Sequence, residues 1–581
     1  MKKIDHIRHS LAHLMASTIQ EFFPGVKFGI GPVIENGFYY DFGLPKSLTP
    51  EDLPKIEKKM RELISQNIVF KKKLISKTEA KKLFPNQLYK LELINEFYEA
   101  EFYEAQPRTK KNKVSIYESG KFIDLCLGPH IKSTREIPSD AFKLTKIAGA
   151  YWRGSEKNPM LTRIYGVAFE NKKELDRYLK LQEESEKRDH RKLGVQLDLF
   201  SFHSVSPGAA FWHPKGMVII KELEKFWREE HERKGYLETS TPTMVKKELF
   251  EKSGHFEHYK ENMFKLEVEG QIYVLKPMNC PESTFLYKTK IRSYKDLPLR
   301  LSEIGKLYRN ELSGVLAGLF RVRQLTMDDA HIYCTPEQIQ NEIGGVLKFI
   351  KEFYQLFELK PEFKLATRPE NYMGELKLWQ KAEKTLEFSL KQNKLKYGLK
   401  PKDGAFYGPK IDIHITDSLG RSWQIATLQL DFQMPERFEL NYIDEKGKKQ
   451  RPVMIHRAIF GSFERFIGIL LEHYGGNLPL WLTPCQIWII PVGTAHRKFA
   501  KEIGKSFQGM DFRCEIKDEN ETVSKKIRDG ELQKISYLLV VGNTELKGKS
   551  VRVRERGKGD IGIMKIERFL EKLKREIKNK L

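Results

Sequence analysis

Residues 299–333 read LRLSEIGKLYRNELSGVLAGLFRVRQLTMDDAHIY. This stretch predicts two long strands joined by a loop. Ser313, Gly314 and Gly318 are residue types that favour a turn between such strands. We therefore expect a hairpin around which the rest of the chain is organised.

Arginines gather on this predicted hairpin. Arg309 stands where the first strand enters the loop, and Arg321 and Arg323 alternate with Phe320 and Val322. Because side chains alternate across a strand, both arginines of the second strand should face the same side. Guanidinium groups bind phosphate oxygens in pairs, so this face suits a polyphosphate. A solvated face with ion pairs is the alternative, and it is the better interpretation of an isolated RVR.

Further polar side chains favour the binding site over the solvated face. Glu311 lies beside the arginines, and Asp328, Asp329 and His331 follow on the same predicted strand. The stretch thus combines anion-binding side chains with groups that bind metals or amines. That combination is unusual for an ordinary surface strand.

The same residues resemble a known family. YRNELSG (308–314), RVR (321–323) and DDAHIY (328–333) resemble motif 2 of the class II aminoacyl-tRNA synthetases, in the form used by threonyl-tRNA synthetases. The resemblance implies activation of L-threonine with ATP and its transfer to tRNA(Thr). Two alternatives are a non-catalytic, tRNA-binding regulatory paralogue and a trans-editing hydrolase.

Length and composition set the outer limits. A chain of 581 residues is too long for one core, so about three domains are expected. A net charge of +24 favours a polyanionic partner, with nucleic acid first, although a lysine-rich proteome would give the same excess. No apolar run approaches a membrane span, and no signal peptide is evident. Five scattered cysteines fit a reduced, cytoplasmic location.

The N-terminal region carries a possible metal-binding set. Residues 4–22 predict an amphipathic helix on which His9 and His13, four apart, share a face opposite the apolar stripe. Cys126 and His130 could complete a four-ligand zinc site with them. A solvated helix face that happens to carry histidines is an equally good interpretation of the helix alone.

HSLAH (9–13) and CLGPH (126–130) also resemble the editing motifs of threonyl-tRNA synthetases. The resemblance implies a pocket that hydrolyses seryl-tRNA, generally without a metal, and adds Lys90 and Asp124 to it. It places the editing domain at residues 1–171. Family members usually begin with a small ubiquitin-like domain. This chain starts directly at the residues that resemble the editing domain, so we expect that it lacks the ubiquitin-like domain.

A linker helix is expected at 172–193, followed by a catalytic domain at 194–478. In it, a helix at 215–234, a strand at 236–241 and Pro242 resemble motif 1, which implies a homodimer. The overall expectation is a multidomain α+β protein. It comprises an N-terminal α+β editing domain, an antiparallel-sheet class II catalytic core and a C-terminal α/β anticodon-binding domain.

Three widely separated residues are implied as zinc ligands. KPMNCP, which contains Cys280, resembles the family segment with the first ligand, and His331 and His456 complete the set. One Zn²⁺ per subunit is therefore expected. Residues 456–465, HRAIFGSFER, are expected to open a helix that runs to about residue 474, and GSFER resembles motif 3, which ends in Arg465.

The resemblance also assigns roles around ATP and Mg²⁺. Arg309, Arg321 and Arg465 are the implied catalytic residues. The implied substrate-binding residues are Asp329, Tyr407, Lys410, Gln429, Ser462 and Glu311.

The chemistry explains why two sites are needed. A zinc site with three protein ligands keeps positions open for the amino and hydroxyl groups of threonine. Valine lacks the hydroxyl and is rejected strongly, whereas serine lacks only a methyl, a difference of about 1–3 kcal/mol. A second, hydrolytic pocket is therefore required.

Residues 479–581 alternate between predicted strands and helices, as in a compact α/β domain. The pattern matches the anticodon-binding domain of class II synthetases, and Glu545 and Arg554 fall where threonyl enzymes contact the anticodon. A solvated edge strand is the alternative for the arginines of VRVR.

Several positions depart from the family pattern. Met327 replaces a usual Gln, Leu325 a frequent Phe, Glu282-Ser283 a Gly-His pair and Ala426 a common Gly. None is an implied zinc ligand or a motif 2 or 3 arginine. We expect an active enzyme with weaker substrate affinity.

Overall fold

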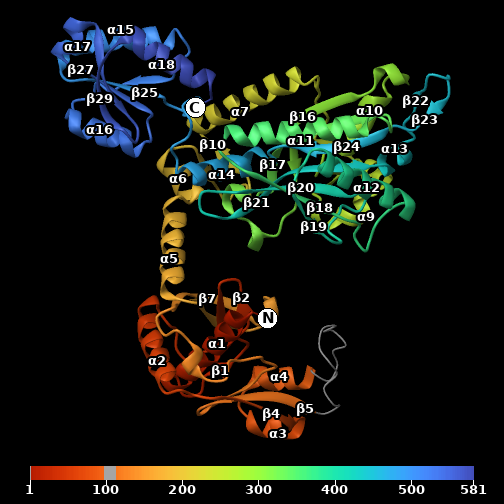
Figure 1. The fold of residues 1–581 in the computed structure, drawn as a ribbon, viewed down its shortest axis with the longest axis vertical. Coiled ribbons are helices and arrows are strands. Elements are labelled where there is room, and N and C mark those ends of the chain that lie inside the picture. The colour runs from red at the N-terminus through yellow and green to blue at the C-terminus, as the bar shows by residue number, and fades with distance from the viewer. Residues whose placement is uncertain (1, 97–112, 581) are drawn as a thin grey trace. The chain divides into compact units, whose positions relative to one another are not determined.

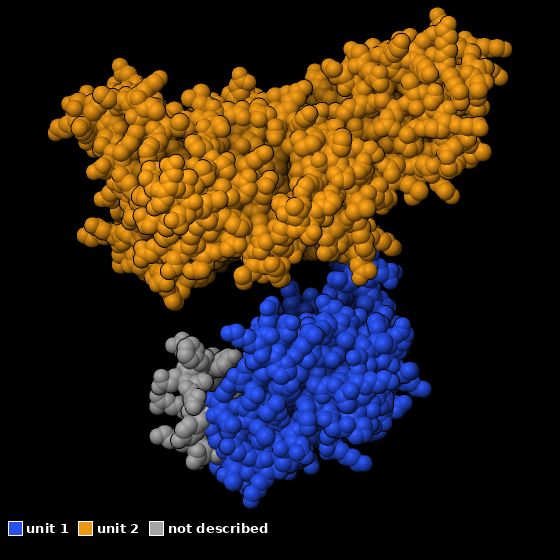
Figure 2. All heavy atoms as spheres, turned by 180° about the vertical axis from the view of Figure 1, so that it is seen from behind, with its two compact units in different colours: residues 1–183 blue, residues 184–581 orange. Residues whose placement is uncertain are grey.

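The computed structural model describes residues 2–96 and 113–580. It divides into two compact units, residues 1–183 and residues 184–581, each of which is described by itself (Figure 2).

The N-terminal unit is built around a helix laid on a sheet. Helix α1 (Lys3–Phe22) packs against α2 (Leu53–Ser65) and strand β3 (Gly37–Gly43). Nearly every residue of α1 from Ile7 to Ile19 is buried, so the predicted helix is confirmed. The apolar stripe is shorter than predicted, because Phe22 is 42% exposed.

Two sheets complete this unit. The larger has the order β1-β3-β8-β7, with β2 paired to β3, and the smaller has the order β4-β5-β6. The bounds of the remaining elements are β1 Lys27–Phe28, β2 Val33–Ile34, β4 Phe70–Ser76, α3 Lys77–Leu83, α4 Leu88–Glu96, β5 Lys113–Ser119, β6 Phe122–Leu125, β7 Phe142–Tyr151 and β8 Met160–Ala168.

The second unit contains a large, mostly antiparallel sheet, seen edge-on among the green and cyan elements of Figure 1. Its order is β11-β16-β17-β24-β21-β20-β18-β19, and only the outermost pairs at each end are parallel. The bounds are β11 Leu237–Glu238, β16 Leu299–Tyr308, β17 Gln324–Cys334, β18 Pro361–Ala366, β19 Tyr397–Lys400, β20 Lys410–Thr416, β21 Ser422–Asp431 and β24 Val453–Ala458.

Helices α11 and α12 contact this sheet, and α14 packs against β17. Helix α5 (Lys172–Lys187) contains the division between the two units. The bounds of the other elements of this part are α6 His190–Gln196, β9 Phe200–Phe202, β10 Ala210–Trp212, α7 Pro214–Arg233, β12 Met244–Lys246, α8 Lys247–Ser253, α9 His255–Tyr259, β13 Lys265–Val268, β14 Gln271–Leu275, α10 Cys280–Lys288, β15 Arg292–Ser293, α11 Ile339–Leu356, α12 Leu376–Gln392, α13 Gln433–Arg437, β22 Tyr442–Ile443, β23 Lys449–Gln450 and α14 Phe463–Tyr474.

The central hairpin is confirmed, with Leu299 opposite Tyr333 and Tyr308 opposite Gln324. Arg321 and Arg323 do not lie on its second strand, because a 3-10 turn, Gly318–Phe320, delays the start of β17. The prediction that they share a strand face is therefore wrong.

Two helix predictions also need correction. His456 lies on strand β24, and α14 starts only after Gly461, whose φ of +69° turns the chain out of the sheet. The predicted single helix at 172–193 is two helices, α5 and α6, because the Asp189 side chain accepts the Arg191 N–H and starts a new helix.

The last part of the chain folds as the predicted α/β domain. Its sheet has the order β26-β25-β27-β28-β29, and the sequence prediction omitted α17 and the strand β29. The bounds are β25 Ile487–Pro491, α15 Arg497–Gln508, β26 Cys514–Ile516, α16 Val523–Leu532, β27 Tyr537–Val541, α17 Asn543–Gly548, β28 Ser550–Glu555, β29 Gly559–Lys565 and α18 Ile566–Lys578.

Candidate active site and editing pocket

The register of the large sheet aligns four predicted site residues in one row. His331 on β17 lies opposite His456 on β24, which lies opposite Gln429 on β21, which lies opposite Lys410 on β20. Residues paired in this way across a sheet project from the same face. Four segments distant in sequence thus supply neighbouring side chains.

Cys280, the first residue of α10, joins two members of this row. The ligand atoms of Cys280, His331 and His456 lie within 4.8 Å of one another, and all three residues are buried. Among the described residues, His331 Nε2 and His456 Nδ1 have no hydrogen-bond partner. The other nitrogen of His456 donates to Asp431 Oδ2 at 2.9 Å. One sulfur and two nitrogens, oriented by a carboxylate, fit a zinc ion with open positions.

Burial favours a neutral His331 imidazole and a protonated Cys280 thiol. It lowers the pKa of His331 well below the ordinary value, with the charge of His456 adding to the effect. It raises the pKa of Cys280 well above the ordinary value, and the neighbouring Asp329 acts in the same direction.

Asp329 and two further predicted residues border the cluster. Asn279 Nδ2 donates to Asp329 Oδ2 at 3.0 Å, and burial raises the pKa of this carboxyl to about 6. The Tyr407 hydroxyl donates to the Gln429 side-chain oxygen, and the Tyr407 ring centroid lies 5.3 Å from that of His456. Acceptors therefore stand beside the candidate metal position.

The arginines of motifs 2 and 3 meet in one region. Arg465 Nε donates to the Phe320 carbonyl at 3.0 Å, and Arg321 Nε donates to Glu311 Oε2 at 3.0 Å. Burial lowers the pKa of Arg465, and the charges of Arg309 and Arg321 lower it further, opposed only by Glu311. Three cations beside one acid give a positive surplus that suits a polyphosphate.

Other side chains of this region have structural partners. Arg323 donates to the Glu311 carbonyl at 2.9 Å and to Ser313 Oγ at 3.2 Å, which holds the loop together. Ser462 Oγ accepts the Arg465 N–H at 3.2 Å and caps α14. Lys410 Nζ lies 3.1 Å from Asp412.

Asp328 belongs to the core, although the sequence grouped it with the binding residues. Its carboxylate accepts from Trp227 Nε1 at 2.6 Å, Arg457 Nη1 at 3.0 Å, and the backbone N–H groups of Ile459 at 2.8 Å and Phe460 at 3.0 Å. Asn279 and Asp431 were not predicted from the sequence, because no short-range pattern gives a signal for either residue.

In the N-terminal unit, the four residues of the two histidine motifs form a second cluster. Cys126 Sγ lies 3.3 Å from His9 Nε2 and 3.3 Å from His130 Nε2, and all four ligand atoms, including that of His13, lie within 4.8 Å. The second nitrogens are engaged elsewhere, because His9 Nδ1 contacts the Pro129 carbonyl at 3.1 Å and His130 Nδ1 contacts Ser10 Oγ at 3.0 Å.

A buried ion pair lies next to His13 in this cluster. Lys90 Nζ lies 2.6 Å from Asp124 Oδ1, and the other carboxylate oxygen accepts from the Tyr40 hydroxyl at 2.5 Å. His13 Nε2 lies 3.7 Å from the same oxygen. Burial lowers the pKa of His13 well below its ordinary value and raises the pKa of Cys126 to about 12. Tyr40 was not predicted from the sequence.

The two predicted anticodon residues differ in exposure. Glu545 is buried, and its carboxylate accepts the Gly542 N–H at 2.9 Å, which caps α17. Arg554 lies on β28, 3.5 Å from Glu531 Oε1.

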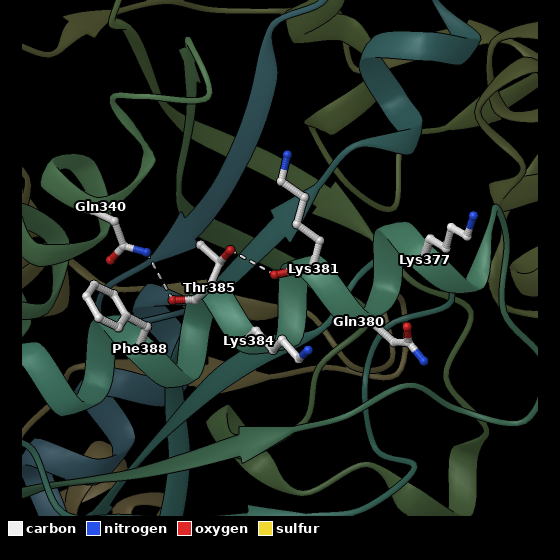
Figure 3. A pocket seen from close by; sticks show the side chains of 7 residues that line it. All are labelled: Gln340, Lys377, Gln380, Lys381, Lys384, Thr385 and Phe388. Atoms are coloured by element: carbon white, nitrogen blue, oxygen red, sulfur yellow. Dashed lines mark hydrogen bonds between the residues drawn. The ribbon is translucent and has the colours of Figure 1, made fainter.

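A groove elsewhere in the catalytic part is separate from these sites (Figure 3). It has a volume of about 510 Å³ and is lined among the described residues by six side chains of α12 and by Gln340 of α11. None of the predicted site residues lines it.

In the described part of the chain, no helix combines the length and apolarity needed to cross a bilayer.

Comparison with family models accounts for all three regions. Residues 264–474 match the tRNA synthetase class II core domain (G, H, P, S and T), residues 486–576 an anticodon binding domain, and residues 114–165 the threonyl and alanyl tRNA synthetase second additional domain. The antiparallel sheet, the arginine cluster and the matched core together define a class II aminoacyl-tRNA synthetase.

Individual relatives narrow the class. The chain is 51% identical over 578 residues to a threonine–tRNA ligase of Carboxydothermus hydrogenoformans, covering 99% of this chain and 89% of the relative. It is 49% identical over 575 residues to that of Desulforamulus reducens, covering 99% and 88%. A crystal structure described as the RNA binding domain of a Cryptosporidium parvum threonyl-tRNA synthetase aligns with a TM-score of 0.65 at 40% identity, covering 67% of this chain and 98% of that one. The chain belongs to the threonine–tRNA ligase family.

Proposed function

We propose that this chain activates L-threonine with ATP, transfers it to tRNA(Thr) and hydrolyses seryl-tRNA(Thr) in its N-terminal unit. The observation that supports this most directly is the buried set of Cys280, His331 and His456, in which one nitrogen of each histidine has no hydrogen-bond partner among the described residues. A non-catalytic paralogue would have no need of that set or of the arginine cluster.

The cluster of Arg309, Arg321 and Arg465 binds the phosphates of ATP. Arg309 contacts the α-phosphate while a carboxylate oxygen of threonine attacks it and pyrophosphate leaves. Arg321 and Arg465 hold the outer phosphates, whose charge a bound Mg²⁺ would help to neutralise. Negative charge shifts among these oxygens during adenylation, and fixed cations that already face them lower the barrier. Glu311 orients Arg321 through their 3.0 Å contact.

The selection of threonine over other amino acids depends on the three candidate zinc ligands. Cys280, His331 and His456 would hold one Zn²⁺, which would supply Lewis-acid positions for the amino and hydroxyl groups of threonine. Asp329 accepts from the bound amino acid, and Tyr407 and Gln429 close the pocket on the same side. A missing hydroxyl leaves these groups unsatisfied, which excludes valine.

The cluster of His9, His13, Cys126 and His130 hydrolyses seryl-tRNA(Thr). Lys90 and Asp124 form a buried ion pair that fixes Tyr40 and the position of His13. Neutral His9, His13 and His130 with Cys126 place a water against the ester bond. Burial lowers the pKa values of all three histidines, so they act as neutral hydrogen-bonding groups near pH 7.

The remaining assignments follow the domain pattern. We assign residues 1–171 to editing, 172–193 to a linker, 194–478 to catalysis and 479–581 to anticodon binding, with Arg554 facing the anticodon and the buried Glu545 fixing the start of α17 beside it. Residues near Pro242 form the contact of a cytoplasmic homodimer.

The deciding experiment is ATP–pyrophosphate exchange with threonine, serine and valine. Strong exchange with threonine, weaker exchange with serine and none with valine supports the proposal. Arg309→Ala should abolish the exchange, whereas Arg528→Ala, which removes an exposed arginine of α16, should leave it unchanged. Absence of exchange with any amino acid, from folded and zinc-loaded protein, would refute the ligase function.

A further inference from the structure

His190 is a buried histidine that the proposed mechanism does not use. It is the first residue of α6 and only 2% exposed. Its Nδ1 donates to Glu472 Oε1 at 2.6 Å, and its Nε2 accepts the Leu319 N–H at 2.9 Å. Asp189, His190 and Glu472 are also close enough to hold an ion, but both ring nitrogens already have protein partners.

The partners determine which nitrogen carries the proton. A carboxylate only accepts, and a backbone N–H only donates. The ring is therefore neutral, with its proton on Nδ1 and its lone pair on Nε2. Glu472 is fixed in turn, because its Oε2 lies 2.5 Å from Arg421 Nη2 and its Oε1 also accepts the His190 backbone N–H at 3.0 Å.

The Leu319 N–H belongs to the loop that leads into Arg321 and contacts Arg465, the two arginines proposed to bind the outer phosphates of ATP. Leu319 lies in the 3-10 turn Gly318–Phe320, immediately before Arg321. The carbonyl of Phe320, the residue after Leu319, accepts a hydrogen bond from Arg465 Nε. The centroids of the Phe320 and His190 rings lie 4.2 Å apart. One short turn thus touches His190 and positions both Arg321 and Arg465.

The close approach of this turn requires a glycine. Gly318 has a φ of +51°, and a Cβ built on it would lie 2.3 Å from His190 Nε2. No side chain fits there without displacing the ring. The backbone of the turn and the histidine are thus fitted to each other.

We propose that His190 is a positioning residue for ATP binding, which couples the turn before Arg321 to helix α14 and so fixes the distance between Arg321 and Arg465. This inference rests on the proposed function. It concerns only the phosphate side of the site, because the candidate zinc ligands Cys280, His331 and His456 include no residue of the turn.

Two substitutions that both introduce a neutral amide test the two hydrogen bonds of His190 one at a time. His190→Gln places an amide oxygen near the Nε2 position and keeps an acceptor for Leu319. His190→Asn places an amide N–H near the Nδ1 position and keeps only the donor to Glu472. In threonine-dependent exchange, we expect His190→Asn to raise the KM for ATP about tenfold, as for loss of one buried hydrogen bond. His190→Gln should stay within about threefold of wild type, and the KM for threonine should change in neither variant.

The control is His496→Asn. This residue is also buried, and its Nε2 contacts Asn543 Oδ1 at 2.9 Å in the C-terminal domain. It should leave both KM values unchanged.

Several results would overturn the proposal. Equal behaviour of the Asn and Gln variants, or a parallel rise in both KM values, would show that His190 has only a general structural role. If His190→Asn does not fold, Gly318→Ala replaces it, since the new methyl displaces the ring. A folded Gly318→Ala enzyme with the wild-type KM for ATP would equally refute the inference. Lack of exchange in the wild-type enzyme would instead refute the proposed function.

Discussion

Two neighbouring aspartates of β17 provide a stringent test of the site. The Asp328 carboxylate is fully buried and accepts from four donors: an indole, a guanidinium and two backbone N–H groups. Asp329 points to the other side of the strand, towards Asn279, and shares that side with His331 two residues later. We predict that Asp328→Asn destabilises the fold and that Asp329→Asn impairs threonine binding.

The size of the first effect follows from the contacts. An asparagine offers one oxygen and turns an N–H₂ group towards donors, so Arg457 is left without its buried charge partner. Breaking such a buried pair costs about 3–5 kcal/mol. For a unit of about 400 residues, unfolding entropy converts this to a fall of roughly 4–6 °C in the melting temperature.

Asp329→Asn should keep the melting temperature within about 2 °C of wild type. Loss of a charged hydrogen-bond acceptor should raise the KM for threonine about 10–100-fold. Differential scanning calorimetry and threonine-dependent exchange measure the two effects. If Asp328→Asn melts like wild type, or if Asp329→Asn leaves the KM for threonine unchanged, the assignment of the two sides of β17 is wrong.

Three further predictions concern the remaining parts of the site. Removing zinc with a chelator should abolish threonine-dependent exchange, and restoring zinc but not magnesium should recover it; exchange that survives in verified metal-free protein would contradict the zinc assignment. Lys90→Met should leave aminoacylation intact but reduce hydrolysis of seryl-tRNA at least tenfold, because Asp124 loses its partner; normal deacylation would place the editing chemistry elsewhere. Burial lowers the pKa values of His13 and His130, so the unfolded chain binds more protons below about pH 6.5 and stability falls as the pH drops. Resistance of residues 1–183 to proteolysis should therefore fall between pH 7 and pH 5, and a flat profile would show that these histidines are not buried and neutral.

Local sequence was sufficient for much of the architecture. The periodicity of residues 4–22 predicted α1, and the alternating pattern after residue 479 predicted the α/β domain, because short-range backbone preferences and one-sided burial specify such elements. The motifs around Arg309, His9 and Cys126 also identified the family, whose membership the relatives confirm. Local preference failed where a single residue redirects the chain, as at Gly461, which separates β24 from α14.

Tertiary structure decided which side chains work together. Cys280, His331 and His456 meet only because strands β17 and β24 pair in one register and the start of α10 lies beside them. Periodicity could place Asp328 and Asp329 on opposite sides of a strand, but only the packed core shows that Asp328 faces four donors. Sequence alone determined most of the elements and the family, since both depend largely on local residue order. The roles of individual polar residues depend on partners distant in sequence, and only the folded chain brings those partners together.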